Sequence, residues 1–342
     1  MSEPRTGIDI ARAFYVDHVA ARLDGVPHAA ALIGDGSEVL GFDDEISTDH
    51  DFRTRVQVFV GSLAEADKAV AATRSVDGEV EVAVAGDFFA ARLGFDPADG
   101  VTLADWLTTP TQRLATLTEG AVFHDVDGLL GGRRDALAWY PDDVWRYVLA
   151  AAWLRVSQHE PFVGRTGGCG DNLGSALIGA RIARDVMRLA FLLERSWAPY
   201  DKWFGTAFAR LTLAGPLAPR LHAVLAAEHW REREAALNEA LTVLARATND
   251  LDLAADVDPS ARQFYTRDIR VVGGARFTDA LVDAISDAEV TALVESLVVR
   301  TDPRVDGTIQ GLPGAIDQVT DSVDVLRSVD RCRALAPALG LR

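Results

Sequence analysis

Two aspartates, Asp49 and Asp51, stand at the head of a segment that we expect to form a β-strand ending at Val60. Side chains of a strand alternate between the two faces of a sheet, so both carboxylates share one face and the valines of the segment share the other. Asp is uncommon in strands. Two neighbouring carboxylates offer the hard oxygen ligands that Mg²⁺ takes in proteins. We therefore predict that Asp49 and Asp51 bind magnesium.

A Gly-Ser pair, Gly36 and Ser37, precedes these aspartates, with eleven residues between Ser37 and Asp49. Glycine lets the backbone approach a phosphate closely, and the N-terminus of a helix attracts anions. Ser37 can cap a short helix through Leu40 and give its hydroxyl to the β- or γ-phosphate of a nucleoside triphosphate. We predict that Gly36 and Ser37 form a phosphate-binding turn.

A third carboxylate is expected on a neighbouring strand. The segment 79–84 alternates, with Glu79 and Glu81 on one face and valines on the other. Glu81 would complete the predicted metal site or take the proton from an attacking hydroxyl as a general base. Glu79, on the same face, and Glu160, in the helical part that follows residue 132, are alternatives that the sequence leaves open for this role.

The elements that must position these residues are those of an α+β fold. Helical spacing of apolar residues predicts helices over 8–23 and 63–74. After Gly132 the pattern changes, and long helical segments dominate the rest of the chain. The sequence thus predicts two domains, residues 1–132 with a small mixed sheet and residues 133–342 mostly helical. The strands of the first domain are expected over 29–33, 49–60, 79–84 and 121–124.

Composition narrows the class of protein. The chain has 342 residues, 49% of them hydrophobic, and a formal net charge of −17. This charge argues against a general nucleic-acid-binding surface, which would be basic. Its two cysteines, Cys169 and Cys332, stand far apart in the sequence and fit a reducing compartment. The sequence shows no signal-peptide pattern and no apolar run of the ~18 residues that span a bilayer, so we expect a cytoplasmic protein that does not enter a membrane.

The residues Gly36-Ser37, followed by Asp49-His50-Asp51, resemble the signature of the polymerase-beta-type nucleotidyltransferases. A small αβ domain followed by a helical domain also resembles the antibiotic nucleotidyltransferases that act on aminoglycosides and lincosamides. Over nearly its whole length, the chain looks closest to a family of nucleotidyltransferase-like proteins catalogued only as a domain of unknown function. The stretches that carry this likeness are GSEVLGFDDEISTDHDF, VFHDVDG, WYPDDVWRYVLAA, QHEPFVGR, APYDKWFGTAF and DQVTDSVDVL.

This resemblance implies a Mg²⁺-dependent enzyme that moves a nucleoside monophosphate, most simply AMP from ATP, onto an acceptor hydroxyl and releases pyrophosphate. It implies metal binding by Asp49, Asp51 and Glu81. The acidic composition favours a small-molecule acceptor, including a cationic one, over nucleic acid. The chain departs from the related enzymes in one respect, because its loop before Asp49 carries extra carboxylates. We expect these to be solvated.

Two basic residues of the predicted second domain are candidates for contacts with the phosphates. The related two-domain enzymes use a basic residue of the helical domain against the triphosphate, and Lys202 matches by position and local sequence. Arg165 leads into a glycine-rich stretch, 167–171, between two apolar helices. An irregular polar loop at that point would suit the lining of a cleft, with Arg165 as a phosphate contact.

Two other functions remain open from the sequence. The same fold could bind a nucleotide without catalysis, as a regulator or an antitoxin-like partner. A metal-dependent phosphohydrolase is the third possibility, because two His-Asp pairs occur, His50-Asp51 and His124-Asp125. That class places its His-Asp pair on a helix, whereas both pairs here fall in segments that we expect to be strands.

Overall fold

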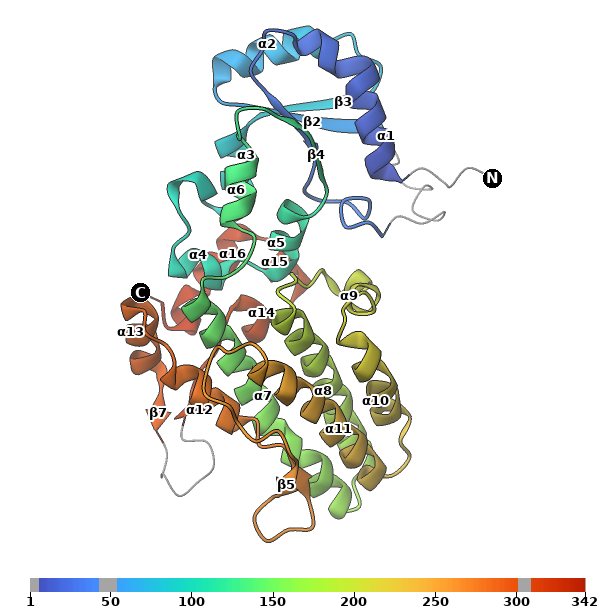
Figure 1. The fold of residues 1–342 in the computed structure, drawn as a ribbon, viewed down its shortest axis with the longest axis vertical. Coiled ribbons are helices and arrows are strands. Elements are labelled where there is room, and N and C mark those ends of the chain that lie inside the picture. Colours follow the sequence, from blue (N-terminus) through green and yellow to red (C-terminus); the bar gives the residue numbers. More distant parts are fainter. Residues whose placement is uncertain (1–5, 43–53, 301–308, 342) are drawn as a thin grey trace. The chain divides into compact units, whose positions relative to one another are not determined.

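The computed structural model of the chain describes residues 6–42, 54–300 and 309–341 (Figure 1). Within this part, the chain divides into two compact units between Trp139 and Tyr140. Residues 106–108 belong to the second unit and residues 328–330 to the first. The first unit contains a small mixed sheet and the second is mostly helical, which confirms the α+β class predicted from the sequence.

The first unit is built on a four-stranded sheet in the order β3-β2-β1-β4. β1 is antiparallel to both of its neighbours, whereas β2 and β3 are parallel and are joined by α2, since parallel strands need a crossover connection. The strands are β1 (Ala29–Leu32), β2 (Arg55–Val60), β3 (Glu79–Val84) and β4 (Ala121–Asp125). The helices are α1 (Gly7–Phe14), α2 (Leu63–Thr73), α3 (Ala85–Leu93), α4 (Leu103–Thr108, which ends in the second unit), α5 (Thr111–Thr118) and α6 (Gly131–Ala136).

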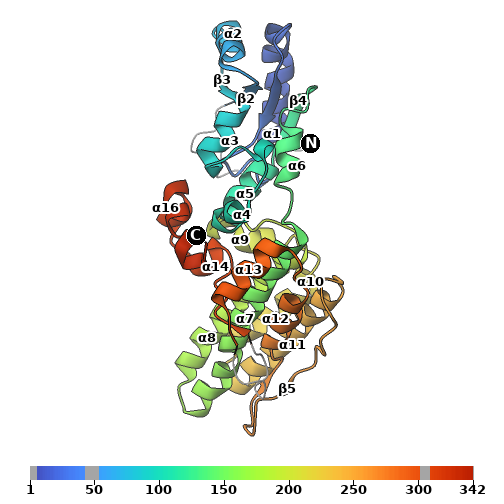
Figure 2. The same ribbon diagram turned by 90° about the vertical axis from the view of Figure 1, so that its left-hand side faces the viewer.

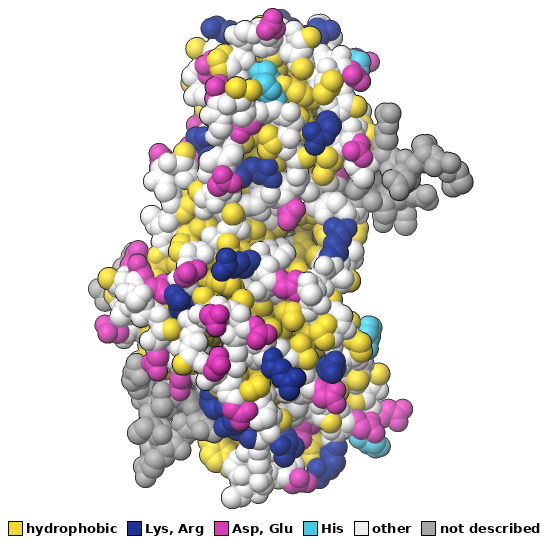
Figure 3. Space-filling view, in the orientation of Figure 1, with side chains coloured by type: hydrophobic (Ala, Val, Ile, Leu, Met, Phe, Trp, Pro, Cys, Tyr) yellow, Lys and Arg dark blue, Asp and Glu magenta, His cyan; other side chains and the backbone are white. Residues whose placement is uncertain are grey.

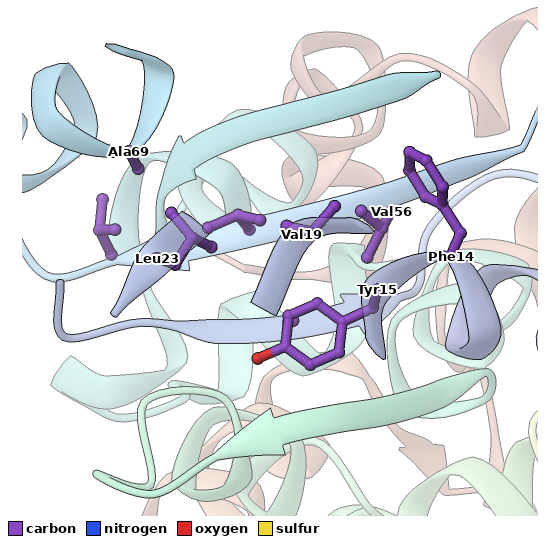
Figure 4. Close-up of a cluster of buried hydrophobic side chains, with 9 residues drawn as sticks. Phe14, Tyr15, Val19, Leu23, Val56 and Ala69 are labelled. Carbon is purple, nitrogen blue, oxygen red and sulfur yellow. The ribbon is translucent and has the colours of Figure 1, made fainter. Parts of the chain in front are cut away.

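The two faces of β2 are chemically different. Val56, Val58 and Val60 are fully buried and pack against the helical segment that runs from α1 through a π-helical turn, η1 (Tyr15–Val19), and a 3-10 turn, η2 (Ala20–Leu23) (Figure 4). The valine face predicted from the alternation is therefore confirmed. The opposite face carries Arg55 and Gln57 before it becomes apolar at Phe59, whose ring meets the ring of Phe88 on α3 edge to face. This second face is the polar one.

The second unit is a helical bundle in which α7, α8, α10 and α11 pack against one another, and α12 packs on α7 (Figures 1 and 2). Two tryptophans of α7, Trp145 and Trp153, are fully buried. The indole N–H of Trp145 donates to the carbonyl of Leu192 at 3.0 Å, and that of Trp153 donates to the hydroxyl of Thr248 at 3.1 Å. Burial of these side chains therefore leaves no indole N–H without a hydrogen bond. The larger helices are α7 (Asp142–Gly168), α8 (Asn172–Leu193), α9 (Asp201–Phe208), α10 (Ala214–Ala226), α11 (Trp230–Asn249), α12 (Ala275–Asp283) and α13 (Ala288–Leu297).

Shorter elements complete this unit. Two-stranded ribbons pair β5 with β6 and β7 with β8. They are followed by short helices near the end of the chain. The elements are β5 (Arg262–Gln263), β6 (Arg270–Val271), β7 (Val299–Arg300), β8 (Ile309–Gln310), α14 (Ile316–Val319), α15 (Val323–Leu326) and α16 (Val329–Ala334, whose first residues belong to the first unit).

The surface carries charges of both signs. On the face shown in Figure 3, acidic and basic side chains are interspersed and do not gather by sign. In the part of the chain that the structure describes, no helix combines the length and the apolar character needed to cross a lipid bilayer.

Candidate functional site

The chain leaves β1 through a tight turn that contains Gly36 and Ser37. The amide of Phe42 donates to the carbonyl of Ser37 at 2.9 Å, and the amide of Gly41 to that of Glu38 at 3.2 Å. These bonds make a closed turn, where the sequence suggested a short helix capped by Ser37. Gly36 has a φ of +149°, a value that other residues rarely adopt. The turn therefore requires glycine at this position.

Arg55, the first residue of β2, lies against the same turn. Its Nη2 donates to the carbonyl of Asp35 and to Oε1 of Glu38, both at 2.6 Å. A Cβ atom added to Gly36 would lie 2.5 Å from Glu38 Oε1 and 2.7 Å from Arg55 Nη2. The absence of a side chain at Gly36 thus makes room for this ion pair, and the pair ties the turn to the sheet.

We expect the change Gly36→Ala to destabilise the first unit by about 1–3 kcal/mol, because the new methyl group clashes with the ion pair and φ is unfavourable. The matched control is Gly132→Ala on α6, where no heavy atom lies within 4 Å of the added Cβ. There alanine should stabilise the helix by about 0.5–1 kcal/mol. Urea unfolding followed by circular dichroism measures both, and equal stabilities of the two variants would contradict the prediction.

Gln57 links the turn to the predicted third acid. Its side chain is buried, with 3% of the residue exposed. Oε1 accepts the amide of Ile33 at 2.8 Å, and Nε2 donates to Glu81 Oε2 at 3.2 Å. Gln57 and Glu81 are direct neighbours in the parallel register of β2 and β3. Gln57 thus joins Glu81 to Ile33, three residues before Gly36, on the same face of β2 from which Arg55 holds the Gly36 turn.

Glu81 also faces a guanidinium group. Arg92 of α3 lies with Nη2 3.8 Å from Glu81 Oε1, and its Cζ lies 3.5 Å from the centroid of the Phe88 ring. Burial lowers the pKa of Arg92, while the nearby carboxylates of Glu81 and Asp35 raise it. The Glu81 side chain is 44% exposed, so one side of the carboxylate remains accessible to a ligand. The alternative acid, Glu79, is exposed and is paired in register with Arg55.

Asp49 and Asp51 lie outside the residues that the structure describes, as does the acidic loop before them. Among the described residues, no group of three or more His, Cys, Asp or Glu side chains could hold a metal ion. The predicted ligand set needs Asp49 and Asp51 beside Glu81, so this magnesium site stays a prediction.

The two basic residues predicted to contact phosphates belong to the second unit. Lys202 is exposed on α9, with Nζ 4.6 Å from the ring centroid of Trp203. Arg165 is exposed in the last turn of α7 and lies over the ring of Phe162. Asp201, the neighbour of Lys202, forms an ion pair with Arg184 of α8. Arg184 lies twelve residues after Asn172, the first residue of α8, which is about 18 Å along the helix. Arg165 lies near that first residue, at the end of α7. The structure does not bring Lys202 and Arg165 together.

The segment around Glu160 is helical, which differs from the sequence prediction of a polar loop. α7 continues through Pro161 to Gly168. Proline removes one helical hydrogen bond, but Pro161 and Gly164 are buried against neighbouring segments. A Cβ at Gly164 would lie 2.5 Å from Glu234 Oε2 and 2.9 Å from Ile269, so this glycine serves close packing of the helix. Tertiary contacts here outweigh the local signals for a helix end.

Glu160 is a buried acid whose hydrogen bonds are all to the backbone of a neighbouring segment. It is 4% exposed, and its carboxylate accepts three backbone amides, those of Val272 at 2.9 Å, Gly273 at 3.1 Å and Gly274 at 2.9 Å. Gly274 is the N-cap of α12, and a carboxylate is favourable at a helix N-terminus. Burial raises the pKa of Glu160 to about 7, although the three amides lower it. This acid holds the segment 272–274 to α7.

Comparison with known proteins finds a family match for one stretch of the chain. A family model described as "Domain of unknown function (DUF4037)" matches residues 106–204. This finding agrees with the resemblance to an uncharacterised family over that stretch, which runs from α4 to α9. No curated protein and no solved structure matches the chain.

Proposed function

We propose that the protein is a Mg²⁺-dependent nucleotidyltransferase that transfers AMP from ATP to a hydroxyl of a small-molecule acceptor and releases pyrophosphate. The observation that carries the proposal is that one face of β2 reaches both parts of the site: Arg55 holds the Gly36 turn, and Gln57, two residues further along the same face, holds Glu81. Asp51 stands only four residues before Arg55, the first residue of β2. The covalent chain can therefore bring the aspartate pair to the edge of this same face.

In the proposed reaction the acceptor oxygen attacks the α-phosphorus of ATP. The bond from that phosphorus to the oxygen bridging to the β-phosphate breaks, and pyrophosphate leaves with the bonding electrons. The Gly36 turn and Ser37 hold the β- and γ-phosphates. Magnesium held by Asp49, Asp51 and Glu81 supplies charge neutralisation at the phosphates.

Glu81 is also the candidate base for the proton of the acceptor hydroxyl. Gln57 orients its carboxylate by a hydrogen bond, and the exposed part of the side chain leaves room for the acceptor. Proton transfer to a positioned carboxylate contributes to catalysis when the group lies within hydrogen-bond reach of its proton. The phosphate contacts assigned to Lys202 and Arg165 stay predictions.

A second candidate, nucleotide binding without turnover, is favoured by one observation. Glu81 is engaged by both Gln57 and Arg92, which is an arrangement that a structural acid would also show. A phosphohydrolase is not proposed. His124 and Asp125 end strand β4, and Asp125 Oδ2 accepts the amides of Leu130 and Gly131 at 3.1 and 2.8 Å, which ties it to the start of α6.

The experiment that tests the proposal offers the protein each nucleoside triphosphate with Mg²⁺ and a fractionated metabolite extract. We expect ATP-dependent release of pyrophosphate and an acceptor whose mass increases by one adenylyl group. ATP binding without pyrophosphate release in any fraction would support the non-catalytic candidate. Release of phosphate in place of pyrophosphate would contradict nucleotidyl transfer and revive hydrolysis.

A further inference from the structure

A pocket of about 730 Å³ opens in the first unit where β1 begins and β4 ends. β1 runs from this pocket toward the Gly36 turn, so the pocket lies at the other end of the strand from the proposed nucleotide site. Pockets of this size that combine apolar walls with a few convergent polar groups are the usual sites for small ligands. The polar side chains that line it are Tyr15, Asp24, His28, His124 and Asp127.

Three of these side chains form a fixed cluster. His28 Nδ1 lies 2.8 Å from the carbonyl of Val26, which can only accept, so Nδ1 carries the proton. His28 Nε2 therefore accepts from the Tyr15 hydroxyl at 2.9 Å. The rings of His28 and His124 stack with centroids 4.6 Å apart. Burial and the neighbouring His124 lower the pKa of His28, which agrees with a neutral imidazole in this role.

This cluster does not suit a metal ion but leaves acceptors for a donor ligand. Both nitrogens of His28 are used, so it has no lone pair for a metal. The Tyr15 hydroxyl gives its proton to His28 and keeps oxygen lone pairs that can accept. Figure 4 shows this hydroxyl directed away from Phe14, at the edge of the buried cluster. A ligand that reaches Tyr15 must therefore donate a hydrogen bond.

The charges around the pocket are of one sign. Asp24 and Asp127 are both exposed, and none of the described residues that line the pocket is Lys or Arg. The two aspartates come from the turn before β1 and from the turn after β4, which meet where Ala29 and Asp125 pair. Carboxylates on both sides of a concave site attract a cation. The apolar side chains of the wall are Ala20, Ala21, Leu23, Val26, Pro27 and Val126.

We propose that this pocket binds a small organic cation, an ammonium group carried on an apolar body. The ammonium donates to the carboxylates of Asp24 and Asp127 and to the hydroxyl oxygen of Tyr15, while the apolar body covers the alanine and leucine wall. The two carboxylates, the Tyr15 hydroxyl and the apolar wall then each have a partner on the ligand. This inference does not depend on nucleotidyl transfer, because it uses neither the Gly36 turn nor Glu81.

Three probes of one shape test the proposal by isothermal titration: phenethylamine as the cation, 2-phenylethanol as the neutral analogue and 3-phenylpropionate as the anion. We expect phenethylamine to bind about tenfold more tightly than 2-phenylethanol, because a hydrogen bond between charged groups is roughly twice as strong as a neutral one, and 3-phenylpropionate to give no binding. The imidazole signals of His28 and His124 in NMR spectra should shift with phenethylamine while those of the other five histidines stay in place, which would locate the probe at this pocket.

The double change Asp24→Asn with Asp127→Asn should remove the preference for the cation while leaving the fold intact. The matched control, Asp99→Asn, alters an exposed aspartate of the same unit that does not line the pocket, and should leave binding unchanged. The proposal is overturned if phenethylamine gives neither heat nor imidazole shifts, if the three probes bind equally, or if the double variant keeps the preference.

Discussion

Replacing Asp49 or Asp51 by asparagine is expected to lower ATP-dependent pyrophosphate release about a thousandfold, with little change in stability. A bound divalent cation is worth several kcal/mol to a phosphoryl transition state, and about 4 kcal/mol corresponds to a factor of a thousand in rate. Asparagine keeps the size of the side chain and removes the negative charge that the metal needs. The measurement is pyrophosphate release with saturating Mg²⁺ and ATP, together with circular dichroism of each variant.

The matched control for this prediction is Asp44→Asn in the same acidic segment of the sequence. We expect the carboxylate of Asp44 to be solvated, so this variant should keep full activity. Loss of activity in Asp44→Asn as well would mean that the acidic loop takes part in metal binding. Unchanged turnover in both Asp49→Asn and Asp51→Asn would rule out the aspartate pair as the metal site.

The change Glu160→Ala is expected to destabilise the second unit by about 3–5 kcal/mol, because it leaves three backbone amides without an acceptor. Two of the hydrogen bonds, to Val272 and Gly274, are buried, where water cannot readily replace the lost carboxylate. Glu160→Gln keeps one acceptor oxygen and should fall between the wild type and alanine. Guanidinium unfolding followed by tryptophan fluorescence measures the change, since Trp145 and Trp153 are buried in the same helix.

The control for this variant is Glu239→Ala on α11 of the same unit. Glu239 is exposed, and its ion pair with Arg220 lies at the surface, where such pairs contribute little.

The stability of the protein should also depend on pH through Glu160. Its pKa is raised from 4.5 to about 7 in the folded protein, so the native state binds more protons than the unfolded state between those values. The contribution of Glu160 to stability should therefore fall as pH rises from about 4.5 to 7, so the wild type should lose more stability across this window than Glu160→Gln. Equal pH dependence of the wild type and Glu160→Gln would contradict the assignment.

The local pattern of the first unit was predictable from the sequence because its signals are local. Alternation alone placed Glu79 and Glu81 opposite the valines of β3, and the structure has this strand over the predicted residues 79–84. The Gly-Ser pair also falls in a turn that requires glycine. What could not be predicted was the partner of each strand. The parallel pairing that sets Gln57 beside Glu81 is a long-range contact, and no periodicity encodes it.

The residues that sequence reasoning missed are those placed by such long-range contacts. Arg92 reaches Glu81 from a helix, and Arg55 reaches the Gly36 turn because β1 and β2 are antiparallel. In the second unit, Pro161 followed by glycines indicates the end of a helix, yet α7 continues because Glu160 and its neighbours are buried. From the sequence, His124 was a candidate only as part of the His124-Asp125 pair. Its position in the pocket depends on the pairing of β1 with β4, which the sequence does not reveal.

The position of β1 in the sheet has a consequence for how the protein is made. In the described sheet, the edge of β1 that faces away from β2 pairs with β4, whose first residue, Ala121, is 89 residues beyond Leu32. At a synthesis rate of about 5–20 residues per second, roughly 4–18 s pass before that partner leaves the ribosome. During this interval the backbone N–H and C=O groups on that edge of β1 have no strand partner, and unpaired edges invite association with other chains. The order of the strands along the chain therefore leaves the first unit open to association with other chains until β4 has been made.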